Sequence, residues 1–139
     1  MKTTELRQNN IIGYPNWYKD GKVAEFKVTE LLRDNRVEIS NGRISTTCNA
    51  SVLVPIPITE DRLEKSEFVF DIHEGEYCDG VHNEVFSGSI CIKRRHGNSK
   101  HRWELCIGHI DITFINHWHR LQNLIFLLTG NELKSDLHS

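Results

Sequence analysis

The fold of this chain is decided by the stretch Ser89-Ile-Cys-Ile-Lys-Arg-Arg-His-Gly-Asn-Ser-Lys-His-Arg-Trp-Glu-Leu-Cys-Ile107. Its two ends alternate apolar and polar residues, which predicts strands over Ser89–Arg95 and Arg102–Ile107. Folding about Asn98-Ser99 places Ile90 opposite Ile107, Cys91 opposite Cys106, Ile92 opposite Leu105 and Lys93 opposite Glu104. A type II′ turn at Gly97-Asn98 would shift this register by two residues and keep the same faces. The stretch therefore predicts an antiparallel hairpin.

The N-terminal half also has strand patterns. Ala24, Phe26 and Val28 alternate with polar residues, as in a half-buried strand. Asn41-Gly42 separates two further strand-like runs and favours a type I′ turn, which would place Ile39 opposite Ile44 and Val37 opposite Thr46. We therefore expect this half to be β-rich, as a small barrel or a curled sheet.

A short helix is predicted over residues 60–66. Thr59 is placed to cap it, and Ile58 and Leu63 have the spacing of a hydrophobic staple. A strand over 68–72 and a polar loop over 73–84 follow. After the hairpin, the apolar alternation changes phase at Gly108-His109, which predicts a bulge or a tight turn before a last strand.

The last element is an amphipathic helix from His117 to Thr129. Its apolar residues recur every three or four positions, and Gly130 is placed to end it. Phe126 and Leu127 widen the apolar surface, which predicts deep burial or a shared interface. Together these patterns predict an α+β fold: a mainly antiparallel sheet, a β-rich N-terminal half, one short central helix, and a C-terminal helix packed on the sheet.

Length and composition limit the class of protein. The 139 residues, 38% of them hydrophobic, fit one α+β domain over residues 1–133, with an internal seam near 55–58 and a flexible tail over 134–139. The net charge of −2 gives no global attraction to nucleic acid or anionic membranes. The sequence shows no signal peptide, no membrane span and no C-x-x-C pair, so we expect a cytoplasmic protein with reduced cysteines, no cofactor and no membrane partner.

A local cluster of positive charge offers one candidate site. Residues 85–102 hold five basic and no acidic groups. Such a basic β-ribbon with a neighbouring aromatic suits nucleic-acid binding; its candidate residues are Lys93, Arg94, Arg95, Lys100, Arg102 and Trp103. The alternative is a solvated hairpin tip that faces the acidic stretch over residues 59–84 of the same or another subunit, or in which Arg94 lies over the Trp103 ring.

The loop over 73–84 offers a second candidate. His73, Cys78 and His82 would suit zinc if the loop brought them together, although their spacing is not an established zinc pattern. His117 and His119 cannot share an ion on a helix, where residues i and i+2 point in different directions. No catalytic motif is present, which favours a non-enzymatic protein.

Three segments of the chain form a distinctive set: Glu5-Leu-Arg7 with Asn10, then Pro55-Ile-Pro-Ile-Thr-Glu-Asp-Arg-Leu63, then His119-Arg-Leu-Gln-Asn-Leu124 with Leu128-Thr-Gly-Asn-Glu-Leu133. They resemble the motifs E-L-R-x-G-N, P-I-P-L-T-E-E-W-L and H-x-L-Q-N-L-x-x-x-L-T-G-E-E-L of a group of short uncharacterised proteins of bacterial prophages and other mobile elements. This chain departs from the pattern at Asn9 (Gly in the group), Arg62 (Trp) and Lys65-Ser-Glu-Phe68 (K-F-G-F).

The resemblance implies a mobile-element origin and no mechanism. Its shared residues also have structural explanations: Thr59 as a cap, Gly130 as a helix stop, and Gln122 and Asn123 as ties to a neighbouring loop. We therefore expect a small accessory protein that binds an unknown protein partner or itself. A nucleic-acid-binding module and a metal-binding protein or metal-dependent enzyme are the alternatives.

Overall fold

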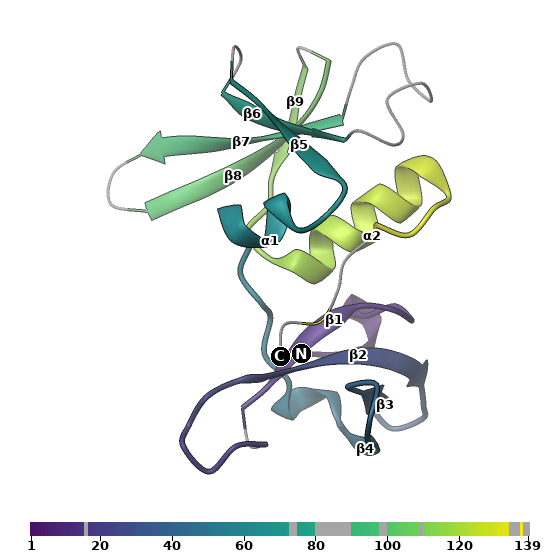
Figure 1. Ribbon diagram of the computed structural model, residues 1–139. Helices are drawn as coiled ribbons and strands as arrows, with labels where there is room; N and C mark the ends of the chain where they lie inside the picture. The colour runs from purple at the N-terminus through teal and green to yellow at the C-terminus, as the bar shows by residue number, and fades with distance from the viewer. Residues whose placement is uncertain are drawn as a thin grey trace. The chain divides into compact units, whose positions relative to one another are not determined.

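The computed structural model describes residues 1–15, 17–72, 75–79, 90–97, 100–108, 110–133 and 137. For residues 79, 95–97 and 100–102 it describes the backbone alone. The fold is α+β and mainly antiparallel sheet, as predicted, and it contains two sheets of four and five strands (Figure 1).

The first sheet is an antiparallel meander in the order β1-β2-β3-β4. Its strands are β1 (Ile11–Tyr14), β2 (Ala24–Leu31), β3 (Arg36–Ser40) and β4 (Ser45–Asn49). The predicted alternation along β2 is confirmed, because Ala24, Phe26 and Val28 are buried while their neighbours are half-buried. They pack in a core with residues of the adjacent strands, including Ile12, Val37 and Ile39.

The turn between β3 and β4 is longer than predicted. The strands pair Ser40 with Ser45 and Ile39 with Thr46, so the expected register was wrong by two residues. A type I′ turn needs positive φ at both central residues. Of that pair, only Gly42 has a positive φ (88°), while Asn41 instead uses its Oδ1 to accept hydrogen bonds from the backbone N–H groups of Arg43 and Ile44, at 3.0 and 2.9 Å. This side-chain capping favours a four-residue loop.

The second sheet has the order β5-β6-β7-β8-β9. Its strands are β5 (Phe68–Asp71), β6 (Glu76–Asp79), β7 (Ile90–Gly97), β8 (Lys100–Ile107) and β9 (Ile110–Phe114). The predicted β7–β8 register is confirmed, from Ile90 opposite Ile107 onward. The turn at Gly108 is also confirmed by its φ of 61°.

Strand β6 corrects the prediction of a polar loop over 73–84. The segment Glu76-Tyr-Cys-Asp79 has only one large apolar residue, so its sequence gives a weak strand signal. Gly75, with a φ of 67°, donates its N–H to Asp71 O at 2.8 Å and returns the chain alongside β5. Pairing with both β5 and β7 and burial of Tyr77 then stabilise the strand.

Among the described residues there are two helices, α1 (Glu60–Glu64) and α2 (Trp118–Thr129), and short 3-10 turns at Thr3–Glu5 and Ala50–Val52. The predicted cap of α1 is confirmed, since Arg62 N donates to Thr59 Oγ1 at 3.2 Å. The predicted stop of α2 is confirmed by Gly130, which has a φ of 75° and donates its N–H to Phe126 O at 2.8 Å. Leu127 is 79% exposed, so the apolar surface of this helix is not fully covered within the described structure.

We expect Thr59→Ala to lower the free energy of unfolding by about 1 kcal/mol, because it removes the acceptor of a helix N-cap. Thr59→Ser, which retains the hydroxyl, should have a much smaller effect. Urea unfolding of both variants, followed by circular dichroism, measures the difference. Equal losses of stability in the two variants would show that Thr59 does not stabilise the protein through its capping hydroxyl.

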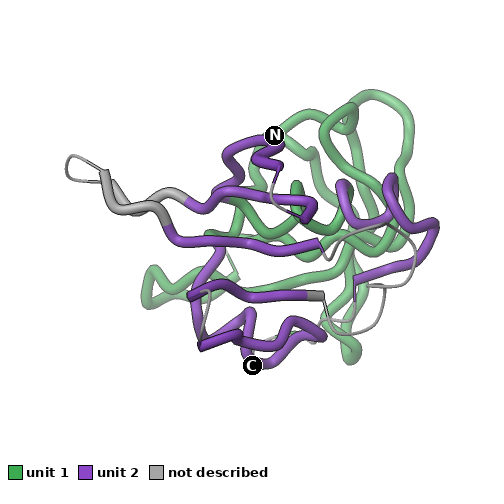
Figure 2. Tube along the Cα trace, turned by 90° about the horizontal axis from the view of Figure 1, so that it is seen from above, with its two compact units in different colours: residues 1–57, 117–123, 137–139 green, residues 58–116, 124–136 purple. Residues whose placement is uncertain are grey.

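The chain forms two compact units (Figure 2). Unit 1 takes in Met1–Pro57, His117–Asn123 and Leu137–Ser139, and unit 2 takes in Ile58–Asn116 and Leu124–Asp136. The chain first passes from one unit to the other between Pro57 and Ile58. Two sequence-based expectations stay predictions: that residues 1–133 form a single domain, and that residues 134–139 form a flexible tail. No helix among the described residues has the length and apolar character needed to cross a membrane.

Candidate functional site

The hairpin formed by β7 and β8 extends beyond its neighbouring strands (Figure 1). Pairing of β7 with β6 ends at Lys93, and pairing of β8 with β9 ends at Glu104. Beyond these rows, each strand pairs with no described strand except the other, although Trp103 O still accepts a hydrogen bond from Ile115 N at 2.8 Å. We call residues 94–97 and 100–103 the ribbon. A two-stranded ribbon of this kind is narrow enough to enter the major groove of B-DNA.

The pairing of the ribbon places basic residues opposite one another. Arg95 is opposite Arg102, and His96 is opposite His101. The sequence from 94 to 103 contains no acidic residue. Like charges at directly opposite positions of a sheet are destabilising. The register thus brings the positions of two arginines, Arg95 and Arg102, together at the backbone, an arrangement that suits an anionic partner.

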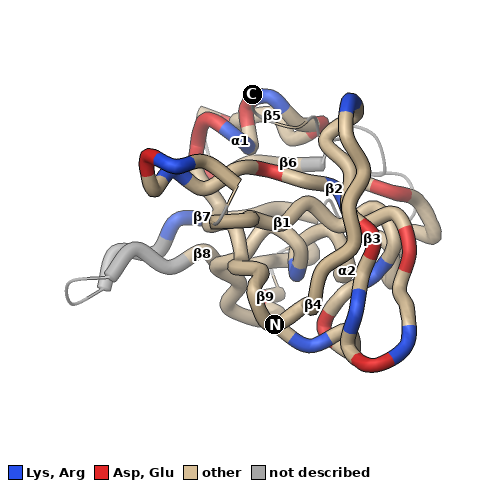
Figure 3. Tube along the Cα trace, turned by 90° about the horizontal axis from the view of Figure 1, so that it is seen from below, with Lys and Arg blue, Asp and Glu red and all other residues tan. Residues whose placement is uncertain are grey.

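Two predicted site residues lie at the base of the ribbon and are already paired with acids. Lys93 Nζ lies 3.3 Å from Glu76 Oε2, and Arg94 donates to Glu60 Oε1 at 3.0 Å. Figure 3 shows the basic positions on β7 in blue and the acidic positions on α1 in red. Lys93 and Arg94 are therefore held by carboxylates of the same chain. The candidate nucleic-acid interface is reduced to the outer positions Arg95, Lys100 and Arg102.

Trp103 is a core residue. Its side chain is 5% exposed, its indole Nε1 donates to Ile58 O at 3.1 Å, and its ring packs edge-on against Tyr77. The guanidinium of Arg94 pairs with Glu60. In this structure the Trp103 ring offers no free face to a nucleic-acid base, because the indole both fills the core and satisfies a buried carbonyl.

Three cysteines form a row across the middle strands of the second sheet. Cys78 on β6 is opposite Cys91 on β7, which is opposite Cys106 on β8. Directly opposite residues of antiparallel strands project from the same face. The adjacent row on that face contains Glu76, Lys93 and Glu104, and Asp111 on β9 is opposite Cys106. We call these seven residues the thiol face.

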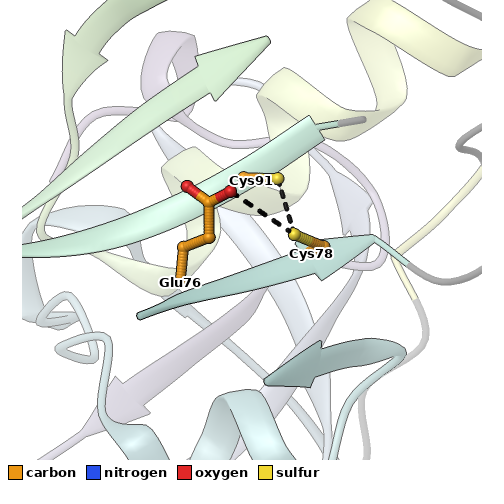
Figure 4. A group of neighbouring side chains, drawn as sticks. All are labelled: Glu76, Cys78 and Cys91. Atoms are coloured by element: carbon orange, nitrogen blue, oxygen red, sulfur yellow. Dashed lines mark hydrogen bonds between the residues drawn. The ribbon is translucent and has the colours of Figure 1, made fainter. Parts of the chain in front are cut away.

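The thiol face contains a close cluster of potential metal ligands (Figure 4). The Sγ atoms of Cys78 and Cys91 lie 2.7 Å apart, and Glu76 Oε1 lies 3.8 Å from Cys78 Sγ. Glu76 and Cys91 are buried and Cys78 is half-buried. Cys78 was predicted to join His73 and His82, which lie outside the described residues. The partners that the structure gives it are Glu76 and Cys91.

Burial and nearby carboxylates keep these thiols protonated. Desolvation is the main cause that raises the pKa of Cys91 far above its ordinary value, and Cys78 and Glu76 raise it further. The pKa of Cys106 is raised to about 12, mainly by desolvation and then by Asp111, whose Oδ1 accepts a hydrogen bond from Cys106 Sγ at 3.2 Å. None of the three is therefore an activated thiolate nucleophile in this environment.

His117 and His119 are closer than predicted. His117 precedes α2 and forms an isolated bridge with Pro57, so the helical spacing does not apply to the pair. Their rings stack at 6.1 Å with an interplanar angle of 13°. His119 is 4% exposed, and its pKa is lowered to about 4 by burial first and by His117 and Arg120 next. The lowered pKa identifies a buried neutral imidazole.

The predicted ties from α2 to a loop are confirmed. Gln122 Oε1 accepts from Ile11 N at 2.8 Å, and its Nε2 donates to Asn9 O at 3.1 Å. Asn10 Nδ2 donates to Asn123 Oδ1 at 2.7 Å. Asn9 adopts a φ of 77°, the left-handed conformation expected where the resembling group has glycine. These motif residues have structural roles, which leaves the ribbon and the thiol face as the candidate sites.

No protein-family model, curated protein or solved structure matches this chain. The ribbon and the thiol face are therefore assigned from their own geometry and chemistry.

Proposed function

We propose that this protein binds nucleic acid through the ribbon, with duplex DNA as the preferred form. The observation that carries the proposal is the pairing of basic residues across a two-stranded ladder that extends past the rest of its sheet. A phosphate backbone supplies negative charge on both sides of such a ribbon. Binding would place these phosphates against the positive charge of Arg95 and Arg102.

Duplex DNA is favoured over single strands by the position of Trp103. Proteins that bind single strands usually stack bases on exposed aromatic rings. Trp103, the aromatic residue within the ribbon, is buried and hydrogen-bonded. Contacts from arginine and lysine to phosphates need no such platform, and the major groove of B-DNA admits a two-stranded ribbon.

The test compares wild type with Arg95→Gln/Arg102→Gln in fluorescence anisotropy over a salt series. We expect the double variant to bind a duplex DNA probe roughly 10- to 100-fold more weakly at low salt, and to lower the slope of log affinity against log salt by about 2. Single-stranded DNA and duplex RNA of matched sequence form the other arms. Tighter binding of either one would contradict the assignment to duplex DNA.

A charge-matched control separates the ribbon from net charge. Lys19 and Arg43 are exposed residues of unit 1, outside the ribbon. Lys19→Gln/Arg43→Gln removes the same two positive charges, so it should change the affinity and the salt slope far less. Equal losses in the two double variants, or no binding of wild type at low salt, would overturn the proposal.

The mobile-element origin and the accessory, protein-binding role stay predictions. Leu127 and Ile72 are 79% and 77% exposed, which is compatible with a protein interface. Nothing around these two side chains indicates the chemistry of a partner. DNA binding is consistent with a role in a mobile element, because such elements act on DNA.

A further inference from the structure

We propose that Cys78, Cys91 and Glu76 bind one zinc-class divalent metal ion on the thiol face. This inference is independent of DNA binding by the ribbon. The three side chains come from adjacent strands: Glu76 and Cys78 lie on β6, and Cys91 lies directly opposite Cys78 on β7. Two thiolates and one carboxylate form a ligand set that suits zinc.

The positions of the ligand atoms fit such a site after a small adjustment. One ligand atom from each of the three residues lies within 4.8 Å of the others. Tetrahedral zinc with Zn–S bonds of about 2.3 Å holds two sulfurs about 3.8 Å apart. The sulfurs lie 2.7 Å apart in this structure, which is between the roughly 2.05 Å of a disulfide and the zinc value, so a zinc ion needs them to separate by about 1 Å. Figure 4 shows the three side chains directed toward one another between the two strands.

The charged residues of the thiol face favour a bound cation at the two cysteines. Of the seven residues of this face, Glu76, Glu104 and Asp111 are carboxylates and Lys93 is basic; the next pair on the same side along β7 and β8 is Arg95 opposite Arg102. Glu76 is 8% exposed, and Lys93 lies against its other oxygen, Oε2, at 3.3 Å. Lys93 thus leaves Oε1, the oxygen nearer Cys78, directed at the sulfurs. A divalent cation would neutralise the negative charge that forms when the two thiols lose their protons beside Glu76.

The same charges argue against a disulfide as the main use of the pair. Thiol–disulfide exchange proceeds through a thiolate, and the neighbouring Glu76 carboxylate disfavours a thiolate that has no cation beside it. A metal ion removes that obstacle because it binds both sulfurs as thiolates. In the binding step the two S–H protons are released to solvent, two metal–sulfur bonds form, and Glu76 contributes a carboxylate oxygen. A water molecule takes the fourth position.

The first test measures metal binding by the intact, untagged, reduced chain. We expect one equivalent of Co²⁺ to give the intense visible bands of tetrahedral cobalt together with a sulfur-to-metal charge-transfer band, and one equivalent of Zn²⁺ to displace it. In weak buffer near neutral pH, each bound ion should release two protons. Octahedral cobalt spectra without charge transfer, or no proton release, would overturn the proposal.

Two variants identify the ligands. Cys78→Ser/Cys91→Ser should abolish the charge-transfer band and weaken Co²⁺ binding at least 100-fold. Cys106→Ser is the matched control, since Cys106 is a buried cysteine of the same row that the proposed site does not use. It should retain the band and bind within about threefold of wild type. Loss of the band in Cys106→Ser would overturn the assigned ligands.

A count of free thiols in denatured protein tests the competing disulfide. Four reactive thiols are expected for protein purified under reductant, in agreement with four free cysteines. If Cys78 and Cys91 form a disulfide on exposure to air even when Zn²⁺ is present, the pair is a redox-active dithiol and the metal-site proposal is wrong. Protection of both thiols by bound Zn²⁺ supports the metal site.

Discussion

Gln122→Ala should lower the free energy of unfolding by about 3 kcal/mol. Replacing a glutamine on a protein surface usually changes stability far less. Ile11 is fully buried, and its backbone N–H donates to Gln122 Oε1 at 2.8 Å. The amide of Gln122 also donates to Asn9 O at 3.1 Å. Leaving two such groups without partners costs about 1–3 kcal/mol for each group that stays buried. Urea unfolding at pH 7.5 measures the change.

Two further variants separate hydrogen bonding from packing at this position. Gln122→Met preserves most of the side-chain volume and removes both hydrogen bonds, so it should lose nearly as much stability as Gln122→Ala. Gln8→Ala, at an exposed position, should change stability by less than about 0.5 kcal/mol. A Met variant as stable as wild type would show that Gln122 acts through its volume alone.

The parts of the fold that could be predicted are those in which pattern and turn chemistry agree. Ile90, Ile92, Leu105 and Ile107 fix the faces of the β7–β8 hairpin, and the predicted register holds as far as Gly97 opposite Lys100. The turn after β3 shows the limit of this reasoning. Asn41 and Gly42 form a familiar turn pair, but the Asn41 side chain captures two backbone N–H groups and lengthens the loop.

The thiol face could be predicted only in part, because it depends on a strand that has almost no signal of its own. The hairpin register alone places Cys91 opposite Cys106. Cys78 and Glu76 join them through β6, which exists because β5 and β7 offer it backbone partners on both sides. Tertiary pairing of this kind overrides local propensity.

The ribbon shows the opposite case, in which residue types were identified but their roles were not. Five basic residues and Trp103 are one cluster in the sequence, yet the structure divides them between sheet and ribbon. Lys93 and Arg94 pair with carboxylates from β6 and α1. Trp103 is buried against Tyr77 and Ile58. These partners are distant in sequence, so no local pattern could identify them.

The second large effect that we expect is a loss of stability in acid caused by His119. Burial is the main cause that lowers the pKa of His119 to about 4, and His117, Arg120 and the N-terminal amine lower it further while Glu5 opposes them. In the unfolded chain a histidine has a pKa of about 6.5, so the unfolded state binds the proton first. The stabilising contribution is therefore complete above pH 6.5 and is lost as the pH falls toward 4.

The size of this loss follows from the two pKa values. Relative to neutral pH, His119 should account for about 2 kcal/mol of lost stability at pH 5 and about 3 kcal/mol at pH 4. Urea unfolding of wild type and His119→Gln between pH 8 and pH 4 measures it, because carboxylates that titrate in the same range contribute equally to both proteins. The difference between the two curves should narrow by that amount as the pH falls.

His117→Gln is the matched control for this titration. The pKa of His117 is also lowered, by burial first and Arg120 next, but this ring is only half-buried. The free energy of unfolding of His117→Gln should therefore change with pH much as that of wild type does. If His119→Gln loses stability in acid as steeply as wild type does, His119 is not the group whose protonation unfolds the protein. The stacked pair would then stabilise the fold through packing alone.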